Sequence, residues 1–423
     1  MFEIKSQIVD MVSKLRGLLK TGKGELPLPS LAGIDRKLPE SYFSLSQGRS
    51  KLRLFPAKYQ ECFDMVEPVQ DDSLFIGRDE EMAALEDALD LWLKGNPCSV
   101  AIIGHSGCGK TSLLHFFQKK VGREIIVKKV TVEKRLATTR DVLSFFEGAL
   151  GLDSQRSGAQ DLADVINGMP RRVVLLENFH MAFLRALSCH EALRTFLYLI
   201  MSTSKNWMWV VSVDYYPWLK MEYLYSMSTY FTCDVTLSRL EKSRFKEVFL
   251  TRQKASGYEL SSATAAEEKS EEAEHMDPSA LDTEAQHAAF METYFEDLYR
   301  LSGGNIQSAL VYWLYCLEYE EEKHEVAIRP IEKPDFSFLS KMDRLHLFSL
   351  AEILNHGSLT AREHGLLFGL GEFESLLVLE FLQNKKVLER GAGGDGVSDD
   401  RFRLNPFFSQ PVASLLQEKN ILY

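Results

Sequence analysis

The sequence of 423 residues lacks long hydrophobic runs. No stretch of about eighteen uncharged apolar residues occurs, and the two richest segments, 172–187 and 207–219, are interrupted by charged residues or histidine. A helix that crosses a bilayer needs about twenty such residues, so we predict no transmembrane segment. The N-terminal residues also lack the apolar core of a secretory signal, because charged residues recur at every turn.

Closely spaced cysteines are also missing. The six cysteines lie far apart and form no C-x-x-C pair, which argues against a zinc site and against a disulfide framework. This use of cysteine fits a reducing compartment, so we expect a cytoplasmic protein.

Positive charge is scarce overall, but the deficit is local. The formal net charge is −11, and the segment 261–284 contains eight Asp or Glu and one Lys. This Ala-, Glu- and Ser-rich segment has little to bury and is typical of a flexible insertion. An acidic contact for a basic partner is the alternative interpretation.

The chain divides into four regions by pattern. Residues 1–70 combine an amphipathic stripe over 2–20 with an irregular arm rich in Pro, Gly and Ser. The stripe favours docking on the chain's own domain, with a membrane surface or a partner helix as alternatives. From residue 71 to 240, short apolar strands alternate with helical segments, which indicates parallel βαβ units. We expect five strands, at Ser99–Ile103, Ile125–Val132, Val173–Leu176, Trp207–Val213 and Thr232–Leu237.

The last two regions have different patterns. Residues 241–330 form a predicted helical lid, with helical segments over 241–256 and 288–319 on either side of the acidic insertion. Residues 331–423 show helices near 340–355, 360–368 and 371–385, followed by two short strands around a Gly-rich tip. Three helices followed by a hairpin are the order of a winged helix.

The most specific motif is G-x-x-x-x-G-K-[ST], placed after a predicted strand and at the start of a predicted helix. Its glycines let backbone N–H groups surround a β-phosphate, and the helix adds the positive end of its dipole. Lys110 supplies a charge to the β- and γ-phosphates, and Thr111 supplies a hydroxyl for Mg²⁺. We therefore predict ATP and Mg²⁺ as ligands. The predicted phosphate-binding residues are Gly104, His105, Ser106, Gly107, Cys108, Gly109, Lys110, Thr111 and Ser112.

A second motif makes the interpretation more specific. The segment FIGRDEEMAALEDAL, residues 75–89, has the form F-[IV]-G-R-[DE]-x-E and lies ahead of the P-loop. With the lid and the winged helix, it resembles the AAA+ ATPases of the origin-recognition and initiator clade and the related STAND-type signalling NTPases, over about residues 71–317. The resemblance implies a P-loop NTPase three-layer sandwich around a five-stranded parallel sheet. It also implies that Phe75, Ile76 and Gly77 contact the base and that Arg78 supports the site.

The resemblance also predicts catalytic positions, and there the sequence departs from the family pattern. The family places Asp-Glu at the end of the third strand; here Glu177 takes the metal position with Thr111, and Asn178 takes the water-polarising position, where it cannot accept a proton. An alternative register makes Glu177 the water activator. Ser212 is the predicted γ-phosphate sensor. Asp214 is the alternative. Ser212 is favoured over it, because a carboxylate that faces a γ-phosphate is repelled by it unless a metal intervenes.

Two arginines that are usual in active relatives are missing from their places. Gln307 stands where the lid arginine would be, and no arginine occurs between residues 217 and 235. Substitutes are available nearby: Arg239, Arg244 and Arg252. Because such an arginine supplies about three to five decades of rate, we expect ATP hydrolysis to be slow, dependent on a partner or absent.

Two functions fit this sequence. The first is an ATP-gated switch that controls assembly with itself or with a protein partner. The second is a DNA-associated ATPase or loader, similar to an initiator or a transposition protein. The third helix of the predicted winged helix contains Glu372, Glu374 and Glu380, with lysines only at its end. Affinity for a duplex comes mainly from Lys and Arg, so the helix favours the switch.

Overall fold

The computed structural model describes residues 51–65, 69–122, 125–152, 158–186, 189–262, 280–320, 325–391 and 400–422. All of these fall within one unit of the chain, Pro39–Tyr423. The amphipathic stripe over 2–20, the arm that follows it, most of the acidic insertion and the Gly-rich tip lie outside the described residues, so the interpretations of these segments stay predictions.

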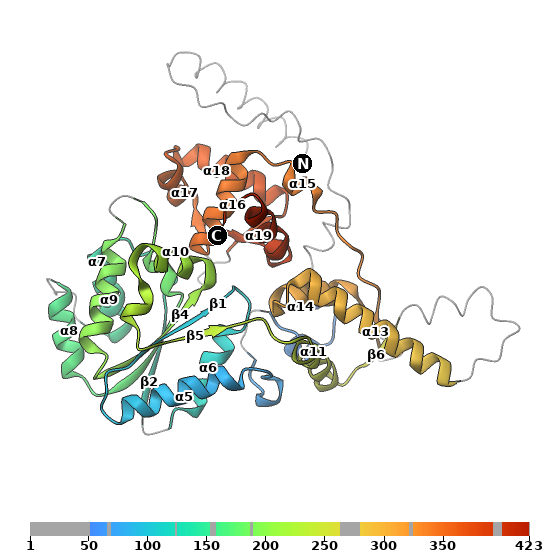
Figure 1. Cartoon of the computed structure of the whole chain (residues 1–423), viewed down its shortest axis with the longest axis horizontal. Helices are drawn as coiled ribbons and strands as arrows, with labels where there is room; N and C mark the ends of the chain where they lie inside the picture. Colours follow the sequence, from blue (N-terminus) through green and yellow to red (C-terminus); the bar gives the residue numbers. More distant parts are fainter. Residues whose placement is uncertain are drawn as a thin grey trace, which may run out of the picture. The chain divides into compact units, whose positions relative to one another are not determined.

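A five-stranded parallel sheet forms the centre of the structure, in the order β2-β3-β4-β1-β5 (Figure 1). Its strands are β1 Ser99–Gly104, β2 Ile126–Thr131, β3 Arg172–Glu177, β4 Trp207–Asp214 and β5 Cys233–Leu237. Every predicted strand is present, with small differences at the ends. Because all five strands run in the same direction, the segments that follow β1, β3 and β4 meet at one edge of the sheet.

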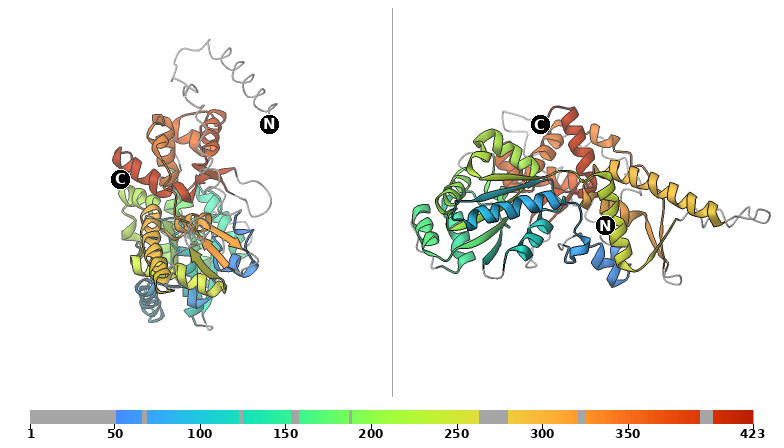
Figure 2. Two further views of the ribbon diagram at one scale, coloured as in Figure 1. Left: turned by 90° about the vertical axis from the view of Figure 1, so that its right-hand side faces the viewer. Right: turned by 60° about the horizontal axis from the view of Figure 1, so that its bottom comes forward.

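Helices cover both faces of this sheet (Figures 1 and 2), and alternate residues of the central strands enter two separate hydrophobic cores. On one face, Val100 and Ile102 pack against α5 and α6; on the other, Ala101 and Ile103 pack with α7, α8, α9 and α10. The predicted three-layer α/β fold is confirmed. The core helices are α5 Asp79–Leu93, α6 Lys110–Lys120, α7 Thr139–Leu150, α8 Ala159–Gly168, α9 Glu191–Thr203 and α10 Tyr215–Tyr225.

The lid region contains three main helices and a small sheet that the sequence did not predict. The helices are α11 Lys242–Ser256, α13 Ala280–Ser302 and α14 Ile306–Cys316, and the strands are β6 Glu259–Ser262, β7 Leu317–Glu320 and β8 Glu325–Ile328. The expected helix over 288–319 is interrupted, because Gly303 and Gly304 adopt positive φ angles at the end of α13. Asn305 then caps α14 by accepting a hydrogen bond from the Ser308 N–H.

The C-terminal domain, residues 335–422, has the element order that we expected for a winged helix. Its helices are α15 Ser337–Ser340, α16 Arg344–His356, α17 Ala361–Phe368 and α18 Glu372–Asn384, and a hairpin pairs β10 Leu388–Arg390 with β11 Arg401–Leu404. A short strand, β9 Leu359–Thr360, adds to the hairpin, and a further helix, α19 Ser409–Glu418, follows. The sequence did not predict these last two elements.

One further helix lies ahead of the core. The short helix α4, Ala57–Cys62, packs on α11 of the lid. No helix in the described part of the chain has the length and apolar character needed to cross a bilayer.

Candidate functional site

The P-loop connects the end of β1 to the start of α6. Gly107 and Gly109 adopt φ angles of +77° and +102°, which side chains rarely tolerate, and Gly109 lies directly before the first turn of α6. These positive φ angles turn the backbone around the space in front of the helix N-terminus. The loop therefore has the concave form that holds a phosphate at the positive end of a helix dipole.

Lys110 is held by the carbonyls of its own loop and by one carboxylate. Its Nζ donates to the carbonyl oxygens of Gly104 and His105, at 2.8 and 2.9 Å, and lies 2.8 Å from Oδ1 of Asp214 at the end of β4. Burial opposes the charge of Lys110, but the Asp214 carboxylate keeps the pKa of Lys110 above its ordinary value. The sequence treated Asp214 only as the alternative to Ser212, and the structure places Asp214 against the P-loop lysine.

His180 is a further polar group beside Asp214. Its Nε2 lies 4.0 Å from Oδ2 of Asp214, and its Nδ1 is buried with no hydrogen-bond partner among the described residues. Burial lowers the pKa of His180 to about 4, against the opposing effect of Asp214. The imidazole is therefore neutral at physiological pH.

A single pocket of about 470 Å³ includes the P-loop and has walls from the core, the lid and the C-terminal domain. Many of the predicted site residues line it. These are Phe75, Ile76, Ser106, Gly107, Cys108, Gly109, Lys110, Thr111, Ser112, Asn178 and Ser212. Thr111 is exposed toward the pocket, as a residue that offers its hydroxyl to a metal would need to be. The sequence pattern thus brought together residues from four separate segments.

Four predicted residues do not line the pocket. Gly104 and His105 instead accept hydrogen bonds from Lys110 through their carbonyl oxygens. Gly77 lies in a turn where a Cβ would meet Leu240 at 3.0 Å. Glu177 is buried beside β2, where its Oε2 pairs with Lys129 Nζ at 3.0 Å and accepts a hydrogen bond from Thr131 at 3.3 Å. Its predicted roles toward metal and water stay predictions.

Arg78, in the segment 75–78, contacts the P-loop directly. Its guanidinium donates to the carbonyl of Cys108 at 3.3 Å and to the carbonyl of Ser238 at 3.0 Å, and it pairs with Glu81 at 2.7 Å. Phe75, three residues earlier, stacks on Phe116 of α6 with ring centroids 4.3 Å apart. The segment 75–78 therefore contacts the P-loop through Arg78 and helix α6 through Phe75.

The lid touches the P-loop through the first turn of α14. The backbone N–H of Gln307 donates to the Gly107 carbonyl at 3.2 Å, and Asn305 donates from its side chain to the Ser106 carbonyl at 2.8 Å. A Cβ at Gly107 would lie 2.4 Å from the Cβ of Gln307. Gln307, which stands at the expected place of the lid arginine, is thus in direct contact with the phosphate loop.

The C-terminal domain reaches the same pocket through the turn that follows α16. Gly357 and Ser358 line the pocket, and a Cβ at Gly357 would lie 2.7 Å from Nε2 of His180 and 3.5 Å from Asp214. Arg401 and Arg403 of β11 also line it. This contribution of the C-terminal domain was not predicted, because no local sequence pattern relates the turn at 357 to the segment around His180 that follows β3.

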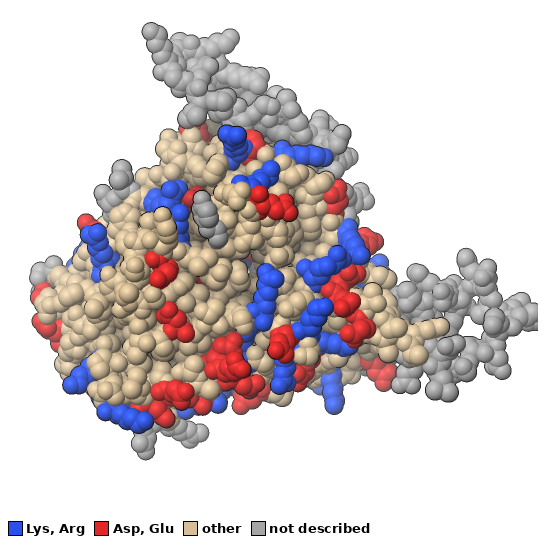
Figure 3. Space-filling view, viewed as in Figure 1, with Lys and Arg blue, Asp and Glu red and all other residues tan. Residues whose placement is uncertain are grey.

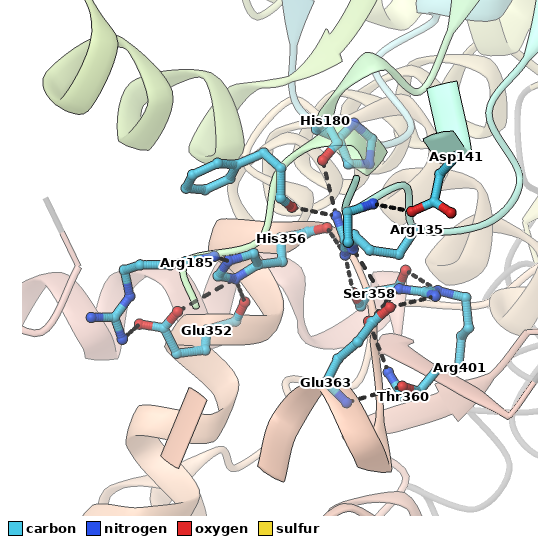
Figure 4. Close-up of polar contacts among 12 residues, drawn as sticks. Arg135, Asp141, His180, Arg185, Glu352, His356, Ser358, Thr360, Glu363 and Arg401 are labelled. Carbon is cyan, nitrogen blue, oxygen red and sulfur yellow. Dashed lines mark hydrogen bonds and ion pairs between the residues drawn. The ribbon is translucent and has the colours of Figure 1, made fainter. Parts of the chain in front are cut away.

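Arg135 joins the core to the C-terminal domain in this area (Figure 4). One Nη donates to the carbonyls of His180 and Phe183 of the core, at 2.9 and 2.7 Å, and the other donates to the carbonyls of His356 and Ser358 of the C-terminal domain, at 3.2 and 2.8 Å. Burial lowers the pKa of Arg135 to about 10. The guanidinium therefore links two segments from different domains through their backbone carbonyls.

A carboxylate and a second arginine complete this arrangement. Glu363 of α17 lies 3.6 Å from Arg135 Nε and accepts two hydrogen bonds from Arg401, at 2.6 and 3.0 Å. His356 stacks on Phe183, with centroids 5.4 Å apart and planes inclined by 4°, and accepts a hydrogen bond from the Arg185 N–H at 3.1 Å. We call the set Arg135, Arg185, Glu352, His356, Glu363 and Arg401 the junction cluster.

The three arginines that sequence offered as substitutes lie in different surroundings. Arg244 is exposed and pairs with Glu247 at 2.9 Å, and Arg239 is exposed at the lid side. Arg252 of α11 is buried and lines the pocket. Only Arg252 of the three therefore contributes to the walls of the pocket.

Comparison with known families agrees with this geometry. Residues 74–202 match the family model described as AAA ATPase domain. This part of the chain is similar to AAA ATPase domains. The prediction of an AAA+ P-loop ATPase is confirmed for these residues, and the match implies that they bind nucleotide. No curated protein matches the chain.

Solved structures with similar arrangements come from archaeal and bacterial proteins. The ORC2 protein of Aeropyrum pernix, in ADPNP–ADP complexes, is 15% identical with a TM-score of 0.45, over 85% of this chain and 98% of that chain. The Walker-type ATPase of Pyrococcus abyssi is 14% identical with a TM-score of 0.38, over 84% and 99%. The RuvB Holliday junction branch migration motor of Thermotoga maritima is 13% identical with a TM-score of 0.35, over 80% and 95%.

Proposed function

We propose that this chain is an ATP- and Mg²⁺-binding switch in which bound nucleotide controls the position of the C-terminal domain, and through it assembly with itself or with a protein partner. One observation carries the proposal: the turn at Gly357 and Ser358 forms part of the wall of the nucleotide pocket. A ligand that enters this pocket contacts three regions of the chain at once. Its binding free energy can therefore favour one arrangement of these regions over another.

The pocket suits ATP and Mg²⁺ by its own chemistry. The Nζ of Lys110 donates to the carbonyls of Gly104 and His105 and pairs with Asp214. The oxygens of a bound phosphate can replace these acceptors. Thr111 offers a hydroxyl in the pocket, and the Asp214 carboxylate lines the same pocket beside Lys110. Hydroxyl and carboxylate oxygens are ligands that Mg²⁺ prefers. Together they would hold the cation that neutralises the phosphates.

We propose that hydrolysis is slow or depends on a partner. Asn178 lines the pocket where a family member has its water-polarising carboxylate, and Gln307 takes the place of the lid arginine. The carboxylate that precedes Asn178 in the sequence, on Glu177, is paired with Lys129. We expect turnover well below about one per second for the isolated chain.

The surface of the C-terminal domain favours a protein partner over a DNA duplex. Phe373 and Leu377 lie one helical turn apart on α18 and are 45% and 40% exposed, and Glu372 and Glu374 begin the same helix. In the face of the molecule drawn in Figure 3, the Lys and Arg side chains in the upper part are scattered, and several of them lie beside Asp or Glu. A helix with apolar and acidic side chains suits a protein surface better than phosphates.

The first test measures nucleotide binding by calorimetry. Wild-type chain should bind ATP with Mg²⁺, and Lys110→Ala should abolish this binding, since it removes the charge that meets the phosphates. Binding without dependence on Lys110 would contradict the proposed site. Vigorous ATPase activity of the isolated chain, removed by Glu177→Gln, would contradict slow hydrolysis.

The second test asks whether the C-terminal domain responds to nucleotide. Gly369 is left-handed helical (φ 67°, ψ 30°), where an alanine costs roughly 1–2 kcal/mol, whereas Gly357 (φ 76°, ψ −42°) lies outside that region, so an alanine there is strained more; Gly369→Ala therefore controls for a positive φ alone. Only Gly357→Ala also places a Cβ against His180; at Gly369 a Cβ meets nothing within 4 Å. ATP should change the X-ray scattering profile and proteolytic pattern of wild type and Gly369→Ala. Gly357→Ala should show the altered pattern already without ATP.

Two outcomes decide between the functions. A change in size on addition of ATP that is indifferent to DNA supports the switch. Retention on DNA that requires ATP and weakens with salt would support the DNA-associated ATPase instead.

A further inference from the structure

Arg252 is a buried cation in the wall of the nucleotide pocket. It lies on α11, and its relative exposure is 6%. Phe75, Ile76, Val248 and Leu310 are apolar residues that line the same pocket, and Val248 lies one helical turn from Arg252 on α11. This composition contrasts with the P-loop end of the pocket, where Lys110 and Asp214 carry opposite charges.

The guanidinium of Arg252 is poorly satisfied by the protein. Its Nη1 donates to the carbonyl of Cys62, the last residue of α4, at 3.4 Å, and its Nε has no hydrogen-bond partner among the described residues. Among the described residues, the titratable group that acts on Arg252 is the Cys62 thiol, and burial lowers the pKa of Arg252 to about 10. A guanidinium carries five N–H donors, so donors remain unused.

A charge that is buried without a partner costs free energy, and the cost is recovered when a ligand supplies the acceptor. The ligand must enter the apolar end of the pocket, where flat rings pack well and a few polar groups fix their orientation. A purine has ring nitrogens that accept hydrogen bonds at its edge. The phosphates, in contrast, belong at the P-loop end with Lys110.

We infer that Arg252 is a base-contacting residue, which donates from its unused N–H groups to an acceptor nitrogen of the adenine ring. The inference rests on the proposed function, because it names the part of ATP that this end of the pocket holds. In this role, Arg252 selects for a purine nucleotide and couples occupancy of the base subsite to α11 of the lid.

The alternative is that Arg252 only caps the carbonyl end of α4 through Cys62. The two roles differ in which ligands they affect. A base contact strengthens the binding of ATP but not of inorganic tripolyphosphate, which has no base. A cap that stabilises the fold affects both ligands equally, and its loss lowers the thermal stability of the chain without ligand.

The experiment uses Arg252→Met, which keeps the length of the side chain and removes its charge and donors. Dissociation constants for ATP and for tripolyphosphate, each with Mg²⁺, are measured by competition with a fluorescent nucleotide. We expect ATP to bind at least about 10-fold more weakly. Tripolyphosphate should change by less than about 2-fold, and the melting temperature without ligand should not fall. Lys254→Met, on the exposed side of the same helix, is the matched control and should change neither ligand.

Three results would overturn the inference: unchanged ATP affinity, an equal loss for ATP and tripolyphosphate, or a lower melting temperature with both affinities reduced. Failure of the proposed function is recognised separately, because wild-type chain would then bind neither ATP nor tripolyphosphate.

Discussion

Two arginines, Arg135 in the junction cluster and Arg252 in the wall of the pocket, have similarly buried side chains but very different numbers of hydrogen-bond acceptors. Arg135 donates to four backbone carbonyls and lies near Glu363, whereas Arg252 has one carbonyl at 3.4 Å and an Nε without a partner among the described residues. Burial lowers the pKa of each to about 10. Burial alone therefore does not distinguish a structural arginine from a ligand-binding one. The number of hydrogen-bond acceptors that the protein supplies to the guanidinium does.

The difference follows from what each arginine connects. Arg135 joins two segments of the protein that are both present, so its acceptors are all supplied by the chain. Arg252 faces a space, and its acceptor must come from outside. Removal of the first should thus be felt in stability, and removal of the second in binding.

The largest expected effect is on stability at the junction. Arg135→Met leaves four backbone carbonyls without the side-chain donor that joins them and leaves Glu363 with Arg401 alone as its charged partner, and the loss of these buried contacts costs about 3–5 kcal/mol. Arg252→Met removes an uncompensated charge and should leave stability unchanged or higher. Urea denaturation, together with hydrogen exchange of the C-terminal domain, measures both. Arg362→Met, an exposed residue of α17, is the control. Equal stability of the Arg135 and Arg252 variants would remove the distinction between the two arginines.

The ends of the pocket also differ in how far sequence could predict them. The P-loop and the segment at Phe75 are local patterns, so their residues were named before the structure and most of them line the pocket. The strands were equally visible, because β1 and β4 are unbroken apolar runs between polar ends. Both motifs describe contacts between residues that are near in sequence or fixed by the βαβ order.

The junction cluster could not be predicted in the same way. Arg135 and Ser358 are more than two hundred residues apart, and no local pattern marks either of them. The contact depends on how one domain packs on another, which periodicity does not describe. The small sheet of the lid was missed for a related reason, since β6 and β8 are short and pair across the acidic insertion.

A smaller effect is expected from the carboxylate at the centre of the junction. Glu363→Gln keeps the shape and the cap of α17 but replaces two charge-assisted hydrogen bonds from Arg401 with weaker ones, at a cost of about 1.5–3 kcal/mol. Glu389→Gln is the matched control, because Glu389 pairs with Arg403 at the surface and such pairs contribute about 0–1 kcal/mol. Both variants are compared by urea denaturation. A loss no greater for Glu363 than for Glu389 would show that Arg135 is satisfied by carbonyls alone.

The smallest expected effect concerns acid, and it separates the two sides of the pocket by pH. Burial lowers the pKa of His356 to about 3, and Arg135, Arg185 and His180 oppose its protonation while Glu352 favours it. Because this pKa is below the unfolded value of about 6.5, the stabilisation is complete above that value and decreases as pH falls toward 3. Between pH 7.5 and 5.5, wild type should lose about 1.4 kcal/mol that His356→Gln does not lose.

The measurement is urea denaturation of both chains at the two pH values, with proteolysis to detect release of the C-terminal domain. His180 and His364, whose pKa values burial also lowers, are present in both chains, so their contributions cancel. The base end of the pocket has no histidine among its lining residues near Arg252, so the preference for ATP over tripolyphosphate should persist at pH 5.5. Loss of the preference for ATP at pH 5.5, together with release of the C-terminal domain, would contradict this separation. The structure of the base subsite would then depend on the junction cluster, and Arg135 and Arg252 would belong to one coupled site.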